Sequence, residues 1–152
     1  MVAVDRDPAA GTGETVVGHV GLSHAWLDAR RRLVDVLVLS PLSTVPERHR
    51  EGIGTALVRA AVAAADELGT PAVFLEGDPR FYGTRGFSPA AVHGCEPASV
   101  RTPAAAFQVA PLGGYEEWMV GRLVHPDVWW RHDAVGLRDP ELARLEELFA
   151  DG

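Results

Sequence analysis

One segment in the first half of the chain combines glycines with basic side chains, and this combination suits the binding of an anion. The apolar run 33–39 leads into residues 42–57, which read LSTVPERHREGIGTAL. Gly52 and Gly54 carry no Cβ, so a ligand can approach their main chain closely. The helix expected to begin near Gly52 offers unpaired N–H groups and a partial positive charge at its first turn. The segment therefore predicts a site for a phosphate group.

Two common phosphate-binding motifs do not fit this segment. A P-loop requires Lys and then Ser or Thr after its last glycine, whereas Thr55 and Ala56 follow Gly54. A dinucleotide fingerprint requires a third small residue three positions after its second glycine, where this chain has Leu57. An ordinary strand–turn–helix corner, with glycines for tight packing, is the alternative to a binding loop.

The segment resembles the coenzyme A loop of the Gcn5-related N-acetyltransferases, the GNAT family, which reads Gln/Arg-x-x-Gly-x-Gly/Ala. The matching residues are His49-Arg50-Glu51-Gly52-Ile53-Gly54, preceded by Leu42-Ser43-Thr44-Val45-Pro46-Glu47. His49 departs from the Gln or Arg of the family pattern. We expect the flanking Arg48 and Arg50 to supply the missing positive charge.

The resemblance implies how acetyl-CoA would bind. Main-chain groups of residues 42–44 would hydrogen-bond the pantetheine arm as an added strand, and the amides of residues 50–55 would hold the pyrophosphate. A backbone N–H in this stretch would polarise the acetyl carbonyl, as in an oxyanion hole. The expected cofactor-binding residues are Leu42, Ser43, Thr44, His49, Arg50, Glu51, Gly52, Ile53, Gly54 and Thr55.

A second segment carries the same resemblance. Residues 74–87 end in Tyr82-x-x-x-Gly86-Phe87, an element that the family carries after the next strand. The amino-acid sequence of this segment is similar to the sequences of one subgroup, the YhbS-like predicted acetyltransferases. The resemblance implies that Tyr82 is the catalytic general acid for the departing thiolate, since a phenol stays protonated near neutral pH. The alternative is a tyrosine that only packs beneath Phe87.

The general base does not follow from the sequence. Many members of the family use a Glu near the end of the central strand, where this chain has Ser40-Pro41. The polar candidates are Asp35, His19, His24, Glu76 and Asp78, and a water relay is a further alternative. We expect Asp35 to be a strand-edge or dimer-contact residue, and Asp78, before Pro79, to be a turn acceptor.

Composition bounds the class of protein. The 152 residues suit a single domain, 1–152, and 47% of them are apolar, which is enough for a packed core. The net charge of −7 disfavours a nucleic-acid surface, and the lone Cys95 fits a reducing cytoplasm. No apolar run approaches the ~20 residues of a membrane span, and the scattered histidines lack metal-binding spacing. We expect a cytoplasmic protein without metal, membrane or nucleic-acid partners.

Hydrophobic periodicity indicates the elements that position both motifs. Strands are expected at residues 1–5, 15–23, 33–39, 71–75, 106–109 and 119–124, helices at 55–68 and 141–149, and a helical turn at 78–82. A turn is expected at 7–13, a loop at 91–105 and irregular structure around Trp129-Trp130. The nearly continuous apolar run 33–39 indicates a strand buried on both faces.

The resemblance implies that these elements form an α/β (α+β) domain with the GNAT-like fold, whose central sheet is mixed and mostly antiparallel with one parallel strand–helix–strand unit. Pro41 and Pro46 deny hydrogen bonds to a neighbouring strand, so the two strands of that unit are expected to splay and admit acetyl-CoA. A C-terminal helix is expected within 139–152, started by Asp139-Pro140 as a cap and a first-turn proline.

The resemblance implies an acetyl-CoA-dependent N-acetyltransferase that moves an acetyl group directly to a primary amine of a small molecule or peptide. Family members normally carry a strand and one or two helices before the strand expected here at 1–5, and this sequence starts after them. We therefore expect a homodimer mate or the C-terminal segment to close the acceptor side. An acyl-CoA-binding module with little or no transferase activity is the runner-up. A structural domain without a cofactor would require both motifs to be coincidental.

Overall fold

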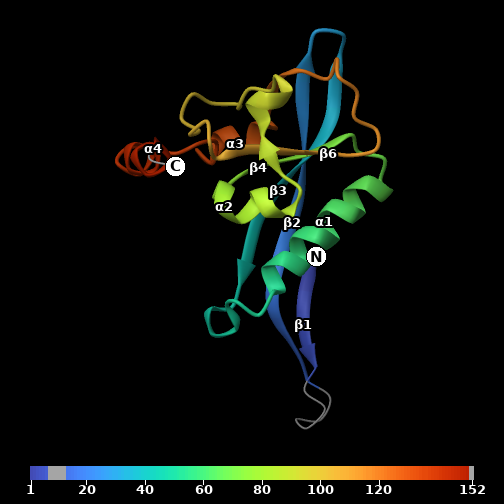
Figure 1. Cartoon of the computed structure of the whole chain (residues 1–152), viewed down its shortest axis with the longest axis vertical. Helices are drawn as coiled ribbons and strands as arrows, with labels where there is room; N and C mark the ends of the chain where they lie inside the picture. The colour runs from blue at the N-terminus through green and yellow to red at the C-terminus, as the bar shows by residue number, and fades with distance from the viewer. Residues whose placement is uncertain (7–12, 151–152) are drawn as a thin grey trace.

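The computed structural model describes residues 1–6 and 13–150 and contains a seven-stranded sheet (Figure 1). The strand order is β1-β2-β3-β4-β6-β5, and β7 pairs with β2. The strands are β1 Val2–Arg6, β2 Glu14–Ala29, β3 Leu33–Thr44, β4 Ala72–Glu76, β5 Ser88–Pro89, β6 Phe107–Pro111 and β7 Gly121–Val124. The helices are α1 Ile53–Glu67, α2 Pro79–Tyr82, α3 Asp127–Arg131 and α4 Glu141–Ala150, with 3-10 turns η1 Pro46–Arg48, η2 Gly83–Arg85 and η3 Ala90–His93.

The sheet is mixed, and most of its strand pairs are antiparallel. β3 runs parallel to β4, and α1 forms the crossover between them. β1 with β2, β2 with β3 and with β7, and β6 with β4 and with β5 are antiparallel pairs. This arrangement confirms the predicted fold class, including the single parallel strand–helix–strand unit.

β3 and β4 separate soon after they meet. The parallel ladder joins Leu37 and Val38 of β3 to β4. Beyond this point β3 continues to Thr44 against β2, whereas β4 continues to Glu76 against β6. In the described part of the chain, the β3 edge from Leu39 onward that faces away from β2 therefore has no strand partner. The predicted splay of the parallel pair is confirmed.

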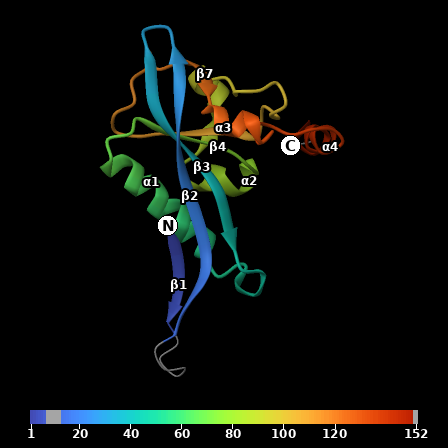
Figure 2. The same ribbon diagram turned by 180° about the vertical axis from the view of Figure 1, so that it is seen from behind.

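Each face of the sheet packs against a different part of the chain. On one face, which we call the α1 face, α1 buries Leu57, Val58, Ala61 and Ala65 at helical spacing against Val20, Leu39, Val73 and Leu75. On the opposite face, the segments that follow β4 cover a second cluster, which includes Val36, Val38, Phe74, Phe107, Met119 and Leu123. Figure 2 shows β2 and β3 from this opposite side, with α1 behind them. Two separate cores thus hold the sheet.

β2 and β3 are longer than the sequence predicted. The strand expected at 15–23 extends to Ala29, because Ala25, Leu27 and Ala29 stay buried on one face, whereas Trp26 and Asp28 between them are partly buried and exposed. The expectation that 33–39 is buried on both faces is wrong at its start. Leu33 is 55% exposed and Asp35 is also exposed, since the cluster on the α1 face begins to cover β3 only at Leu37.

Other boundaries differ less. The segment with Trp129-Trp130, expected to be irregular, forms α3, and the last sheet strand begins at Gly121 rather than at 119. α1 ends at Glu67, and Gly69, the expected stop, follows two residues later with a φ of +74°. α4 begins directly after Pro140. The turn expected at 7–13 falls almost entirely on residues 7–12, outside the described residues. Among the described helices, none has both the length and the apolar character to cross a membrane.

Candidate functional site

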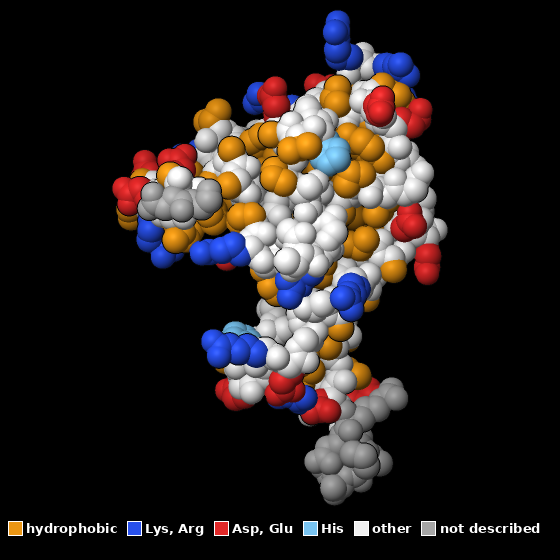
Figure 3. Space-filling model, in the orientation of Figure 1, with side chains coloured by type: hydrophobic (Ala, Val, Ile, Leu, Met, Phe, Trp, Pro, Cys, Tyr) orange, Lys and Arg blue, Asp and Glu red, His pale blue; other side chains and the backbone are white. Residues whose placement is uncertain are grey.

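A hollow of about 600 Å³ lies between the β3–α1 loop and α2, and we call it the loop hollow. It is lined by Leu42, Ser43, Thr44, Arg48, His49, Arg50, Gly52, Ile53, Gly54, Thr55, Phe81 and Arg85. Figure 3 shows basic side chains on both margins of this hollow. The fold therefore brings together all the predicted cofactor-binding residues except Glu51.

The start of α1 is the part of the hollow best suited to an anion. Gly52 enters the helix with a φ of +85°, in the left-handed region that favours glycine, and Arg50 also has a positive φ of +70°. No described side chain caps α1, and its first turn contains no acidic residue. The first N–H groups of a helix lack intrahelical partners and carry the positive end of the helix dipole. An anion placed there would accept hydrogen bonds from these N–H groups and would be stabilised by the helix dipole.

Gly54 faces α2 across the hollow. A Cβ at this position would lie 3.4 Å from Cζ of Phe81 and 4.0 Å from Cγ2 of Thr44. Any larger side chain at position 54 would therefore project into the space between the loop and α2.

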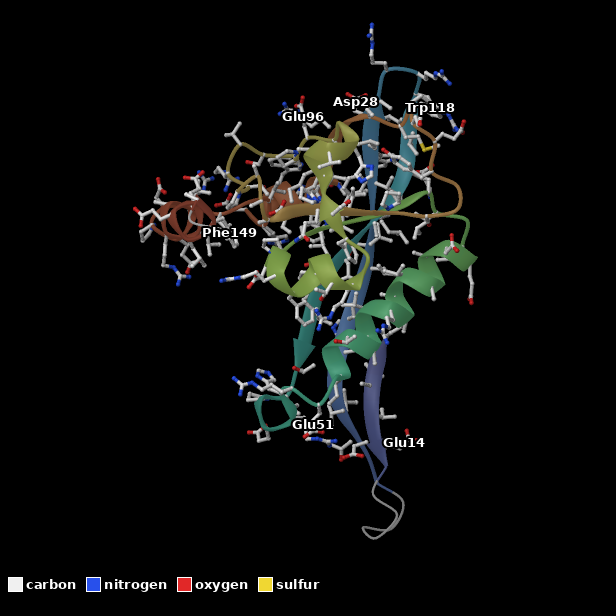
Figure 4. The ribbon with its side chains drawn as sticks, in the orientation of Figure 1. Glu14, Asp28, Glu51, Glu96, Trp118 and Phe149 are labelled. Carbon is white, nitrogen blue, oxygen red and sulfur yellow. The ribbon has the colours of Figure 1, made fainter. Side chains whose placement is uncertain are left out.

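The charge of Arg48 is already compensated, which corrects one expectation. Arg48 forms ion pairs with Glu51, at 2.6 Å, and with Asp5 of β1, and hydrogen bonds to both carboxylates raise its pKa. The carboxylate of Glu51 accepts a hydrogen bond from Nε of Arg48, so its side chain turns toward Arg48 rather than into the hollow (Figure 4). His49 places Nε2 3.2 Å from the carbonyl oxygen of Thr44. Arg48 thus serves to hold the loop against β1 rather than to supply charge to the hollow.

Arg85 is a basic residue of the hollow that the sequence reasoning missed. Its Nε donates to Oγ1 of Thr55 at 2.9 Å, its Nη1 donates to the carbonyl of Phe81, and its guanidinium carbon lies 3.7 Å from the centre of the Phe81 ring. Arg85 therefore joins η2 to the first turn of α1 and adds positive charge beside the helix start. The available signal was its place inside the Tyr82-x-x-x-Gly86-Phe87 element.

Tyr82 ends α2 beside the end of β4. Its ring lies edge-on to Phe81 and Phe87, with centroids 4.8 and 5.8 Å apart, and it packs against Gly77. Burial raises the pKa of Tyr82, and the charge of Arg85 acts in the opposite direction. The phenol therefore keeps its proton at neutral pH, as a general acid requires. The contact with Phe87 also fits the packing alternative, so the catalytic role stays a prediction.

A second cavity, of about 370 Å³, lies where β3 and β4 separate, and we call it the splay cavity. It is lined by Val38, Ser40, Leu75, Glu76, Gly77, Asp78, Arg80, Pro103, Ala106, Leu123, His125, Trp129, Ala134, Gly136, Leu137, Leu145, Leu148 and Phe149. Val38 and Leu123 in its wall belong to the core of the opposite face, whereas Leu75 belongs to the core of the α1 face. Figure 4 shows Phe149 on the side of α4 nearer the sheet.

The fold separates the predicted candidates for a general base. His24 and Asp35 lie 2.8 Å apart across β2 and β3, and neither lines the loop hollow or the splay cavity. His19 pairs with Ser43 in the β2–β3 ladder and lines neither space. Asp78 lines the splay cavity, and it caps α2 by accepting from the backbone N–H of Arg80 at 2.9 Å. Its expected role as a turn acceptor is confirmed.

Glu76 is the other predicted candidate that lines the splay cavity. Its carboxylate accepts a hydrogen bond from Oγ1 of Thr102 at 3.1 Å. Its side chain is exposed at the surface, yet the protein around the carboxylate removes part of its hydration, and this desolvation raises the pKa of Glu76. The Thr102 hydrogen bond and the charge of Arg101 act in the opposite direction.

His125 lines the splay cavity, and no sequence pattern singled it out. Its side chain is 6% exposed and stacks on Trp129, with ring centroids 4.8 Å apart and planes 27° apart. Within the described residues its Nδ1 has no hydrogen-bond partner. Burial lowers the pKa of His125, so the ring is neutral at neutral pH. Residues 1–6 and 13–150 contain no group of three or more His, Cys, Asp or Glu that could hold a metal.

Comparison with known proteins identifies the family of this chain. Residues 4–87 match the model of the acetyltransferase (GNAT) family, and this match spans more than half of the chain. The chain belongs to the GNAT family. The matched residues contain the whole loop hollow and Tyr82, so the two motifs fall within the part of this GNAT chain that the family model describes.

Two solved structures are similar to the GNAT chain. One is the GNAT family N-acetyltransferase YhbS from Escherichia coli in complex with CoA, with a TM-score of 0.67 and 25% identity over 81% of this chain and 67% of that one. The other is a GNAT family acetyltransferase from Brucella melitensis in complex with acetyl-CoA, with a TM-score of 0.56 and 23% identity over 76% of this chain and 62% of that one. No curated protein sequence matches the chain.

These findings confirm the predicted family, the predicted fold and the assignment of the chain to the acetyltransferase enzymes. The individual residues expected to bind the cofactor, and Tyr82 as the acid, stay predictions: the loop hollow brings the former together except Glu51, whereas Tyr82 lines neither the loop hollow nor the splay cavity.

Proposed function

We propose that this GNAT chain is an acetyl-CoA-dependent N-acetyltransferase that moves the acetyl group directly to a primary amine, with residues 1–152 acting as a single domain. The observation that supports this most strongly is the continuity of two features. The β3 edge without a strand partner ends at Thr44, and the uncapped start of α1 follows at Ile53. An extended pantetheine arm can pair with the first while its pyrophosphate meets the second.

The roles of the lining residues follow from this placement. Backbone groups of residues 42–44 pair with the pantetheine arm, and the amides of residues 50–55 hold the pyrophosphate. Arg50 and Arg85 add positive charge on the two sides of the hollow. Tyr82 donates its proton to the departing thiolate, and this role is supported by its position beside the end of β4 and by its raised pKa.

Two measurements test the proposed function. Calorimetric titration with acetyl-CoA should show binding, and a thiol-release assay should show turnover with at least one primary amine from a broad panel. Binding without turnover on any amine would favour an acyl-CoA-binding module instead. A folded chain that does not bind acetyl-CoA would contradict both functions.

We also propose that the chain acts in the cytoplasm as a homodimer, without nucleic-acid or membrane partners. β1 forms one edge of the described sheet, and Val2 and Val4 are 54% and 40% exposed there. The net charge of −7 supports the exclusion of nucleic acid. Light scattering should report about twice the chain mass of 16.3 kDa. A monomer that still turns over an amine would contradict the dimer.

A further inference from the structure

The splay cavity has a definite chemical character. Its walls are mostly apolar, with Val38 from β3, Leu123 from β7, and Leu145 and Phe149 from α4. Its volume of about 370 Å³ lies at the small end of the range for ligand-binding cavities. A compact apolar molecule would therefore fill it and remove apolar surface from water on both sides.

The charged groups of this cavity favour a cation. Asp78 and Arg80 compensate each other through an ion pair at 3.0 Å. The carboxylate of Glu76 accepts its hydrogen bond from a neutral hydroxyl. The charge of Arg101 also reaches Glu76, but Arg101 does not line the cavity, and it pairs at 3.2 Å with Asp133, which Arg138 shares. Glu76 is thus the charge in the cavity wall best able to hold an ammonium group.

His125 has the properties that a proton acceptor needs. It lines the same cavity, its ring is almost fully buried, and its Nδ1 has no hydrogen-bond partner among the described residues. The stacked ring of Trp129 fixes the orientation of the imidazole. Because the ring is neutral at neutral pH, it has a lone pair that can take a proton transiently from a bound ammonium, and its lowered pKa favours release of that proton afterwards.

Resting on the proposed acetyl transfer, we propose that the splay cavity binds the acceptor and that the acceptor is a primary amine on a compact apolar body. Glu76 holds its ammonium group, and His125 takes the proton that must leave before the amine can attack. The location suits this role, because the cavity opens where β3 and β4 separate, beside the place expected for the thioester.

The proton balance of this step closes. The ammonium gives one proton to His125, which becomes an imidazolium. The amine lone pair then forms the C–N bond to the thioester carbon, and the C–S bond breaks as the tetrahedral intermediate collapses. The thiolate takes the phenolic proton of Tyr82, and Tyr82 recovers a proton from the nitrogen of the new amide. The imidazolium finally releases its proton to water, so the products are the amide, the CoA thiol and one proton.

A panel of acceptors tests the substrate class. With acetyl-CoA saturating, we expect kcat/KM for 2-phenylethylamine to exceed that for spermidine and for glucosamine by at least ~10-fold, since an apolar pocket discriminates by burial. A preference for spermidine, glucosamine or a lysine-containing peptide would overturn the inference, and the turnover itself would still support the proposed function. Failure to bind acetyl-CoA would instead remove the proposed function.

Two variants test the two residues. Glu76→Gln keeps the shape and should raise KM for 2-phenylethylamine by ~10-fold or more, with acetyl-CoA affinity unchanged. The matched control is Glu67→Gln on the exposed side of α1. His125→Asn should lower kcat by ~10²–10⁴-fold, with His132→Asn, at an exposed position, as its control.

The outcomes remain decisive even if one variant fails. If His125→Asn does not fold, Glu76→Gln and the acceptor panel still decide. Unchanged KM in a folded Glu76→Gln protein, or unchanged kcat in a folded His125→Asn protein, would overturn the inference.

Discussion

Tyr82 packs its ring so closely against Gly77 that no other residue type fits at position 77 without a shift. A Cβ on Gly77 would clash with Cε2 of the tyrosine ring and would lie 2.9 Å from Cδ2. Gly77 follows directly after β4, so the end of this strand sets the position of the ring. The placement of the phenol therefore depends on a glycine outside the Tyr82-x-x-x-Gly86-Phe87 element.

Gly77→Ala should therefore displace Tyr82 and lower turnover. A misplacement of about 1 Å in a catalytic group can cost ~10²-fold, and acetyl-CoA affinity should change much less than kcat. Gly83→Ala is the matched control, because a Cβ at Gly83 would meet nothing within 4 Å. Steady-state kinetics and titration on both variants make the comparison. Equal turnover in the two variants would mean that the ring position does not matter.

Tyr82→Phe removes the proton donor and keeps the ring that packs against Gly77 and Phe87. We expect kcat to fall by ~10²–10⁴-fold, the usual contribution of a general acid, while acetyl-CoA affinity stays close to that of the unmodified chain. Turnover measured with any accepted amine decides the matter. If it stays within a factor of about two, Tyr82 is a packing residue.

Gly54→Glu places a side chain and a negative charge in the loop hollow, where Phe81 and Thr44 lie next to residue 54. Acetyl-CoA affinity should fall by ~100-fold or more, because charge-assisted contacts to the pyrophosphate are lost and repulsion replaces them. Ala63→Glu, on the exposed side of α1, adds the same charge away from the hollow and should bind normally. Calorimetric titration that finds normal affinity in a folded Gly54→Glu protein would refute the assignment of the loop.

Glu76→Gln should stabilise the fold at neutral pH. Burial raises the folded-state pKa of Glu76 above its ordinary value of 4.5, against the opposing effects of Thr102 and Arg101. The folded chain therefore holds this proton more tightly than the unfolded chain, and stability is lost as pH rises through the folded-state pKa. Glutamine has no such loss, and because the exposed Glu76 side chain is partly screened by solvent, the gain near pH 7 should be small, about a degree or two.

The higher unfolding temperature expected for Glu76→Gln should disappear at acidic pH. Below pH 4.5, the ordinary value, Glu76 is protonated in both states and the two proteins should unfold at similar temperatures. Thermal unfolding across this pH range checks the prediction. A variant that is less stable at pH 7, or a gain that persists unchanged in acid, would show that burial does not dominate at Glu76.

The sequence predicted the parts of this site that local motifs specify. The glycine loop and the Tyr82 element are short strings, and the helix between them has a clear apolar period, so the loop hollow and the parallel unit could be placed in advance. The contacts between distant residues could not. Arg48 meets Asp5 across 43 positions, and Arg85 meets Thr55 across 30. No local sequence pattern indicates which distant residue a side chain will contact.

The burial of individual side chains was a second property that could not be predicted from the sequence. His125 follows a short strand as one of six scattered histidines, and only the packing of Trp129 and the splay cavity around it distinguishes this histidine from the others. Similarly, the apolar run 33–39 gave no sign that α1 would leave Leu33 uncovered, because the reach of a covering helix depends on tertiary structure.

The separate linings of the loop hollow and the splay cavity have a consequence for the order of events in turnover. Because the loop hollow and the splay cavity share no lining residue, a molecule in one does not occupy the space of the other. A ternary complex can therefore assemble in either sequence, and either product can depart first. Double-reciprocal plots at several fixed concentrations of the second substrate should intersect, whereas parallel lines would indicate that one ligand must leave before the other arrives.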